Sequence, residues 1–187
     1  VSRYVSKNNA NIARLKFLKK LFPDCVIVVP FREPMDQARC LLRQHERFTE
    51  IHRQDPFAKR YMRDIGHFEF GALHRPLDFP RSERVGSQAD PESLEYWLEY
   101  WVGAFQEILT NEDSVSLLSY DRLCEQGVSS LRVLESHCHL TDKSLTGTAG
   151  DLLRAPTRYP PLEQDFPKDL LSRVESIYAA LLDRSII

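Results

Sequence analysis

Glycine is scarce in this sequence of 187 residues. Only seven glycines are present, and the first of them is Gly66. Loops that wrap a phosphate group in backbone N–H groups need closely spaced glycines. The sequence has no such Gly-rich loop and no Gly-Lys-Ser or Gly-Lys-Thr run. These 187 residues therefore exclude a phosphate-binding loop of that kind.

Cysteine pairs with the spacing of metal sites are also missing. The four cysteines (Cys25, Cys40, Cys124 and Cys138) form no CxxC motif. We therefore expect no metal site and reduced thiols in a cytoplasmic protein, with Cys25 and Cys124 acting as small buried hydrophobic residues. The four histidines between residues 45 and 74 match no metal template, so we expect them to be surface or core residues.

The sequence also lacks features of membrane and nucleic-acid partners. No apolar run approaches membrane-spanning length and no signal peptide opens the chain, so we expect no membrane partner. A net charge of −2 argues against general binding to nucleic acid. Any phosphate recognition must therefore come from local charges.

What is present is the composition of one globular domain. An apolar content of 42% and a charged content of 28% are typical of globular chains, and 187 residues can bury a core. We therefore assign residues 1–187 to a single domain. Between about residues 49 and 90 the periodicity degrades into an irregular insert, the kind of segment that often carries binding function. We place the contacts to any second substrate there.

Hydrophobic periodicity predicts alternating strands and helices. Strands are expected at Arg3–Val5 and Val26–Val29, with a helix between them that is capped by Asn9 or Asn11. Such a βαβ unit implies parallel pairing. Further helices are expected at about 34–48, 56–65, from 90, 128–138 and from 167, a strand at 116–120, and a loop at 141–166.

The turn after the strand at Val26–Val29 has the pattern of an anion site. Pro34 suits the first position of a helix. Arg32 then lies between the carboxyl end of a buried strand and a helix N-terminus, where open α/β sheets bind anions. Its guanidinium offers a planar fork of donors to a phosphate. The alternative is an ordinary turn whose arginine is solvated or ion-paired.

Several stretches, in this order, resemble the sulfotransferases that use 3′-phosphoadenosine 5′-phosphosulfate. They are Lys7 with the run after it, Leu21-Phe22-Pro23-Asp24-Cys25, Arg32-Glu33-Pro34, Trp101, and Leu118-Ser119-Tyr120-Asp121-Arg122-Leu123. The similarity covers roughly two-thirds of the chain. It implies an α/β fold, a three-layer α/β/α arrangement with a parallel sheet. This is the P-loop-NTPase-like sulfotransferase fold, which we expect to be incomplete at the N-terminus.

The resemblance implies roles for four residues. Arg32 would bind the 3′-phosphate of the donor, helped by backbone N–H groups of the helix that starts at Pro34. Cys40 stands where the family has a serine that holds the same phosphate, and a thiol is a weaker donor. Tyr120 would lie beside the adenine, or else be a core aromatic residue. Lys7 would stabilise charge on the leaving phosphate oxygen, or else be a solvated lysine.

Two parts of the family pattern are missing. The family begins with a loop that wraps the 5′-phosphosulfate, and no such loop is present. Many members also place a histidine base two residues after the lysine, where this chain has Asn9. We therefore expect the carboxyl-terminal part of a sulfotransferase, with little or no activity by itself.

The expected reaction is transfer of a sulfuryl group from 3′-phosphoadenosine 5′-phosphosulfate to a hydroxyl or amine. The acceptor would be a small molecule, a glycan or a peptide, and no metal is needed. The alternative is a degenerate, non-catalytic module of the same fold that binds a nucleotide or another protein. A kinase is disfavoured because the sequence shows no Walker lysine and no magnesium-binding pair.

Overall fold

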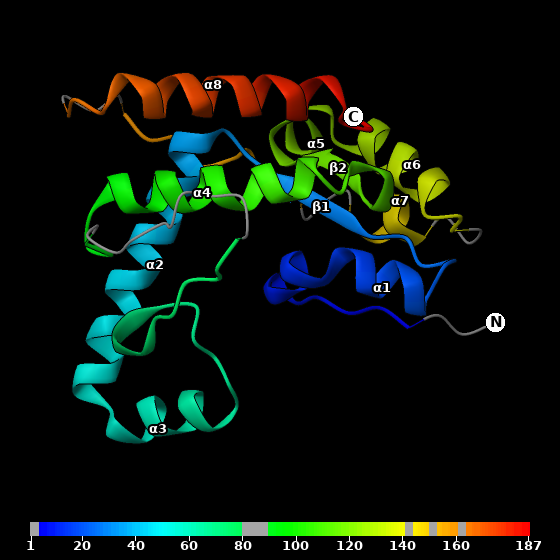
Figure 1. The fold of residues 1–187 in the computed structure, drawn as a ribbon. Helices are drawn as coiled ribbons and strands as arrows, with labels where there is room; N and C mark the ends of the chain where they lie inside the picture. The colour runs from blue at the N-terminus through cyan, green and yellow to red at the C-terminus, as the bar shows by residue number, and fades with distance from the viewer. Residues whose placement is uncertain (1–3, 80–89, 141–143, 150–152, 161–163) are drawn as a thin grey trace.

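The computed structural model describes residues 4–79, 90–140, 144–149, 153–160 and 164–187 (Figure 1). This part of the chain is mixed α/β and mostly helical. Its elements, in order, are η1 (Asn9–Arg14), α1 (Leu15–Leu21), β1 (Val28–Phe31), α2 (Pro34–Gln54), α3 (Pro56–Asp64), η2 (Gly71–Leu73), α4 (Leu94–Leu109), η3 (Glu112–Ser114), β2 (Ser116–Ser119), α5 (Tyr120–Gln126), α6 (Val128–His137), α7 (Ser144–Thr148) and α8 (Lys168–Asp183).

The sheet in the described residues consists of two parallel strands. β1 pairs with β2 in a register that runs from Val28 opposite Ser116 to Phe31 opposite Ser119. Parallel neighbours need a long crossover, which α2 to α4 provide. Leu117 also forms a parallel bridge to Ser185, so the chain after α8 lies against β2. The expectation of an α/β fold with parallel pairing is confirmed at this coarse level.

The core is built around α4. Trp97, Leu98, Trp101 and Ile108 of this helix are each at most 1% exposed, because apolar side chains occupy most of its circumference. α2 and α8 pack against it, and Figure 1 shows α8 running alongside α4. This packing fixes the start of α2 next to the sheet.

Some predicted boundaries are wrong for local reasons. Arg3 lies outside the described residues, while Tyr4 and Val5 are 92% and 87% exposed and form no strand, because no neighbouring strand covers them. The described chain therefore lacks the first strand of the predicted βαβ unit. The cap before η1 is Asn8, whose Oδ1 accepts from the N–H of Ala10 at 2.9 Å, rather than Asn9 or Asn11.

The start of α4 also differs from the prediction. We expected the helix to begin at Asp90, but Asp90 Oδ1 accepts from the N–H of Glu92 at 2.9 Å and so closes a separate turn. Ser93 caps α4 instead, with its hydroxyl accepting from the N–H of Tyr96 at 3.2 Å. The expected strand at 116–120 stops at Ser119, because the same kind of serine cap starts α5 at Tyr120.

The described part of the insert is more regular than expected. α2 continues to Gln54, α3 follows after the capping residue Asp55, and the segment with η2 packs back against both helices. In Figure 1, α3 lies at the end of α2 that points away from the sheet. Residues 80–89 lie outside the described residues.

Candidate anion-binding site

The turn that carries Arg32 is held in place by backbone and side-chain hydrogen bonds. Glu33 caps α2, its Oε2 accepting from the N–H of Asp36 at 2.7 Å. Gln37 Oε1 accepts from the N–H of Arg32 at 3.2 Å and also from Trp101 Nε1 at 3.1 Å. Because Trp101 belongs to the core helix α4, the backbone of Arg32 is tied to the most buried part of the molecule.

Three of the four predicted site residues come together here. Arg32 Nη1 lies 3.3 Å from Cys40 Sγ. The guanidinium carbon of Arg32 lies 5.4 Å from the ring centre of Tyr120, within range of a cation–π contact. A hydrogen bond with Cys124 and burial raise the pKa of Tyr120, and the charge of Arg32 opposes this. The three side chains come from the turn after β1, from α2 and from α5.

Lys7 is not part of this cluster. It lies in the exposed segment before η1 and makes no hydrogen bond or ion pair with the described residues. Cys25 and Cys124 are half-buried rather than buried, and all four cysteines are free thiols.

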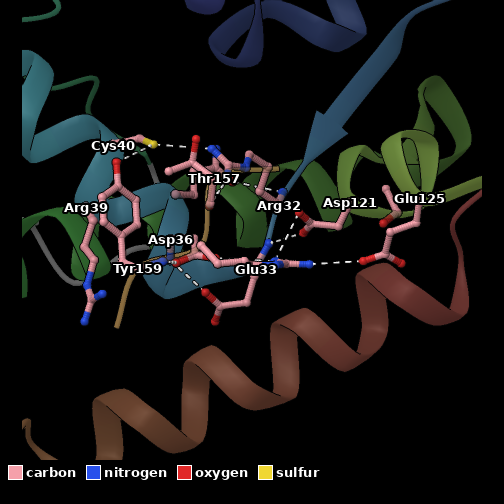
Figure 2. Close-up of polar contacts among 12 residues, drawn as sticks. Arg32, Glu33, Asp36, Arg39, Cys40, Asp121, Glu125, Thr157 and Tyr159 are labelled. Carbon is pink, nitrogen blue, oxygen red and sulfur yellow. Dashed lines mark hydrogen bonds and ion pairs between the residues drawn. The ribbon is translucent and has the colours of Figure 1, made fainter. Parts of the chain in front are cut away.

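A segment far along the chain covers the site, which the sequence did not reveal. We call residues 153–160 the covering segment. The carbonyl of Thr157 accepts from Arg32 Nη2 at 2.9 Å, and the hydroxyl of Tyr159 lies 3.4 Å from Cys40 Sγ. The N–H of Tyr159 donates to Asp36 Oδ1 at 3.1 Å. Figure 2 shows Thr157 and Tyr159 facing Arg32 and Cys40. A ligand of Arg32 must therefore compete with a protein carbonyl.

The arginines around Cys40 have unused capacity for an anion. Arg32, Arg39 and Arg43 form no ion pair with a carboxylate of the described residues. Arg39 and Arg43 instead lie over the ring of Tyr159, at 5.5 and 5.7 Å from its centre. The Nε atoms of Arg32 and Arg39 are buried without a hydrogen-bond partner in this part of the chain. The present partners are neutral, since Arg39 donates to the carbonyl of Pro160 at 2.6 Å and Arg43 to the hydroxyl of Tyr159 at 3.0 Å. Guanidinium groups without a carboxylate partner suit phosphate or sulfate.

Arg158 has the opposite environment. Its guanidinium lies 3.4 Å from Asp36, 3.2 Å from Asp121 and 3.3 Å from Glu125. Asp36 and Asp121 are each 6% exposed, and Asp121 also accepts from the N–H of Glu33 at 2.8 Å. Arg158 therefore neutralises two buried carboxylates and anchors the covering segment, which leaves it unsuited to bind an anion.

The metal and membrane findings are negative for the residues described. No group of three or more His, Cys, Asp and Glu side chains among them could hold a metal ion. Within the same ranges, no helix is both long and apolar enough to cross a membrane. The arrangement that remains is a guanidinium with a fixed backbone, flanked by a thiol and an aromatic ring.

Comparison with known proteins adds no relative to this picture. No family model matches the chain, and no curated protein or solved structure matches it either.

Proposed function

We propose that this chain is the carboxyl-terminal part of a sulfotransferase that uses 3′-phosphoadenosine 5′-phosphosulfate. The observation that supports this most is the convergence of Arg32, Cys40 and Tyr120. The resemblance assigns all three to the nucleotide end of the donor, although they lie on three separate elements. The P-loop-like three-layer fold is part of the same proposal.

In this proposal Arg32 exchanges its neutral partner for a charged one. A 3′-phosphate oxygen would replace the carbonyl of Thr157 at Nη2, and a charge-assisted hydrogen bond is stronger than a neutral one. The unpartnered Nε of Arg32 would supply a second donor. Cys40 would contribute a weak thiol donor, and Tyr120 would pack its ring against the adenine.

The chemical step would rely on positioning and charge stabilisation. The acceptor oxygen or nitrogen would attack sulfur, and the bond between sulfur and the phosphate oxygen would break. Lys7 would stabilise the charge on that leaving oxygen. The acceptor would be a small molecule, a glycan or a peptide that gives up its proton during the step.

One observation favours a second candidate function, a non-catalytic module of the same fold. The Thr157 carbonyl already occupies Arg32, and Cys40 replaces the stronger serine donor. A degenerate nucleotide-binding or protein-interaction module would keep these contacts permanently.

Calorimetric titration with 3′-phosphoadenosine 5′-phosphate separates a chain that binds the donor nucleotide from a protein-interaction module. We expect the wild-type chain to bind, and Arg32→Ala to bind about 10- to 150-fold more weakly, which corresponds to loss of a charged hydrogen bond of about 1.5–3 kcal/mol. The control is Arg47→Ala, which removes an exposed arginine further along α2 and should bind like wild type.

Two outcomes contradict the proposal. Equal binding by wild type and Arg32→Ala would show that Arg32 does not hold the 3′-phosphate. No binding by the wild type would favour the protein-interaction module.

A further inference from the structure

The cationic residues of this chain are unevenly distributed. Residues 1–23 contain six basic residues and no acidic residue. Because the whole chain has a net charge of −2, the remaining residues together carry −8. The first carboxylate in the sequence is that of Asp24, directly after this basic segment.

Helix α1 arranges part of this charge in a row on its exposed side. Lys16 and Lys20 are exposed and one helical turn apart, so they lie on the same face. Lys19 points elsewhere, because its Nζ donates to the carbonyls of Pro23 at 3.2 Å and Cys25 at 2.7 Å. The chain beyond α1 is thereby held against the end of the helix.

A row of large apolar side chains runs beside the lysines. Phe17 and Leu21 are 58% and 53% exposed, again one turn apart, and Phe22, just past the end of the helix, is 59% exposed. Leu15, on the opposite side of the helix, is buried in the core and fixes the orientation of α1. Phe17 and Leu21 therefore point outward because the helix is anchored.

Neighbouring acidic groups do not neutralise this face. No described cation of residues 4–23 forms an ion pair with a carboxylate of the described chain. η3 packs against α1. Its Glu112 is paired with Arg184 at 2.9 Å, so Asp113 is the acidic residue of η3 that forms no ion pair with the described residues. The face therefore combines a net positive charge with exposed apolar surface.

We propose that this α1 face, with Lys16 and Lys20 beside Phe17 and Leu21, docks peripherally on an anionic lipid surface. Lysines beside large apolar side chains on one exposed helix face suit the boundary between charged headgroups and acyl chains. A soluble polyanion would complement the lysines and leave the apolar row in water. The earlier expectation of no membrane partner rested on the lack of a spanning run, which does not bear on surface contact. This proposal does not depend on the proposed transferase activity.

Helix α3 serves as a matched comparison within the same chain. It also exposes an apolar pair one turn apart, Phe57 and Tyr61, whose rings stack at 6.2 Å. However, residues 55–64 contain three basic and two acidic residues, and Asp64 pairs with Arg63 at 3.2 Å. The α3 face has the apolar row without a comparable excess of positive charge.

Vesicle co-sedimentation of the full chain tests the proposal. We expect binding to phosphatidylcholine vesicles that contain about 30% phosphatidylserine, and little binding to pure phosphatidylcholine. Lys16→Glu with Lys20→Glu should weaken the partition coefficient about thirtyfold or more, because each lysine near an anionic surface contributes about a factor of five. Phe17→Ser with Leu21→Ser should also lose binding.

The controls separate charge, apolar contact and misfolding. Lys16→Arg with Lys20→Arg should bind like wild type, and so should Phe57→Ser with Tyr61→Ser on α3. Circular dichroism should be unchanged in every variant, since all the altered side chains are exposed. The proposal is overturned by equal binding to neutral vesicles, by retained binding in either α1 double variant, or by loss of binding in the α3 variant alone. Binding to heparin without binding to vesicles would assign the face to a soluble polyanion instead.

Discussion

The two ends of α2 bury polar side chains in opposite ways. Near its N-terminus, the carboxylate of Asp36 is buried and compensated by Arg158, while Arg32 and Arg39 donate to backbone carbonyls and each keeps a buried Nε without a partner among the described residues. Near its C-terminus, His45 and His52 are only 6% and 4% exposed, and they pack against aromatic rings. At the N-terminal end of α2 a buried charge is compensated by an opposite charge, whereas at the C-terminal end the buried side chains are kept neutral.

Hydrogen bonds at the histidine end are compatible with neutral rings. His74 Nδ1 lies 2.6 Å from the carbonyl of Glu69 and so carries a proton, and in the neutral ring Nε2 accepts from the hydroxyl of Tyr96 at 2.5 Å. His45 Nδ1 accepts from the N–H of Gly71 at 3.3 Å and must therefore be unprotonated. Burial lowers the pKa of His45, His52 and His74. The proposed anion contacts lie at the first end of α2, whereas the second end holds the insert on the helix.

The largest loss of stability at the histidine end is expected when a side chain is added at Gly71. Its φ is +72°, and a Cβ would lie 2.7 Å from His52 Nδ1 and 2.8 Å from the backbone carbon of Phe48. We expect Gly71→Ala to lower the free energy of unfolding by about 2–5 kcal/mol, from left-handed strain plus overpacking. Urea denaturation would measure the loss.

Gly66 provides the control for that substitution. Its φ of +76° is nearly the same, yet nothing lies within 4 Å of its Cβ position. Gly66→Ala should therefore cost only the strain, about 1–2 kcal/mol. Equal losses in the two variants would show that the insert does not pack against His52 as closely as described.

The next effect concerns the charged end. Arg158→Ala would leave Asp36 and Asp121 buried without their cation, and we expect a loss of about 1–3 kcal/mol in unfolding free energy, less than for a fully buried pair because the Arg158 side chain is 48% exposed. The control is Glu125→Ala, which removes the partner that is 59% exposed and should change stability by about 0.5 kcal/mol or less. If both changes cost the same, charge pairing does not hold the covering segment.

The sequence predicted the parts of this site that depend on local pattern. Arg32 was predicted from the end of a strand and the proline start of a helix, whereas the family resemblance was needed to place Cys40 beside it. Tyr120 required the family resemblance, because no local signal links it to Arg32. The apolar runs predicted strands near both β1 and β2, but the expected partner of the first was Arg3–Val5, and the structure pairs β1 with β2 instead.

The covering segment could not be predicted in this way. Thr157 and Tyr159 lie in a stretch without hydrophobic periodicity, and their partners Arg32 and Asp36 are more than a hundred residues earlier. The helical period placed Asp36 on a polar face, and the structure buries it because this distant segment lies over it. The histidine cluster was missed for the same reason, since the contact between His45 and Gly71 forms only after the insert folds back.

The smallest change in unfolding free energy per residue is expected from lowering the pH, which should act through the buried histidines near the C-terminal end of α2. The folded pKa values of His45, His52 and His74 lie below the unfolded value of about 6.5, so the unfolded chain binds more protons once the pH falls below that value. Their contribution to stability is complete above about pH 6.5 and declines as the pH falls toward their folded pKa values. The slope should be at most about 1.4 kcal/mol per pH unit for each histidine.

Urea denaturation at pH 7.5, 6.5 and 5.5 measures this slope. His45→Gln should flatten it, whatever its effect on stability at pH 7.5, because one titrating group is removed. The control is Phe57→Ser on the neighbouring helix α3, which changes an exposed side chain without removing a titrating group and should keep the wild-type slope. A slope that survives the combined His45→Gln and His74→Gln changes would show that these two buried histidines do not set the pH dependence, and the proposed exclusion of charge at this end of α2 would be wrong for them.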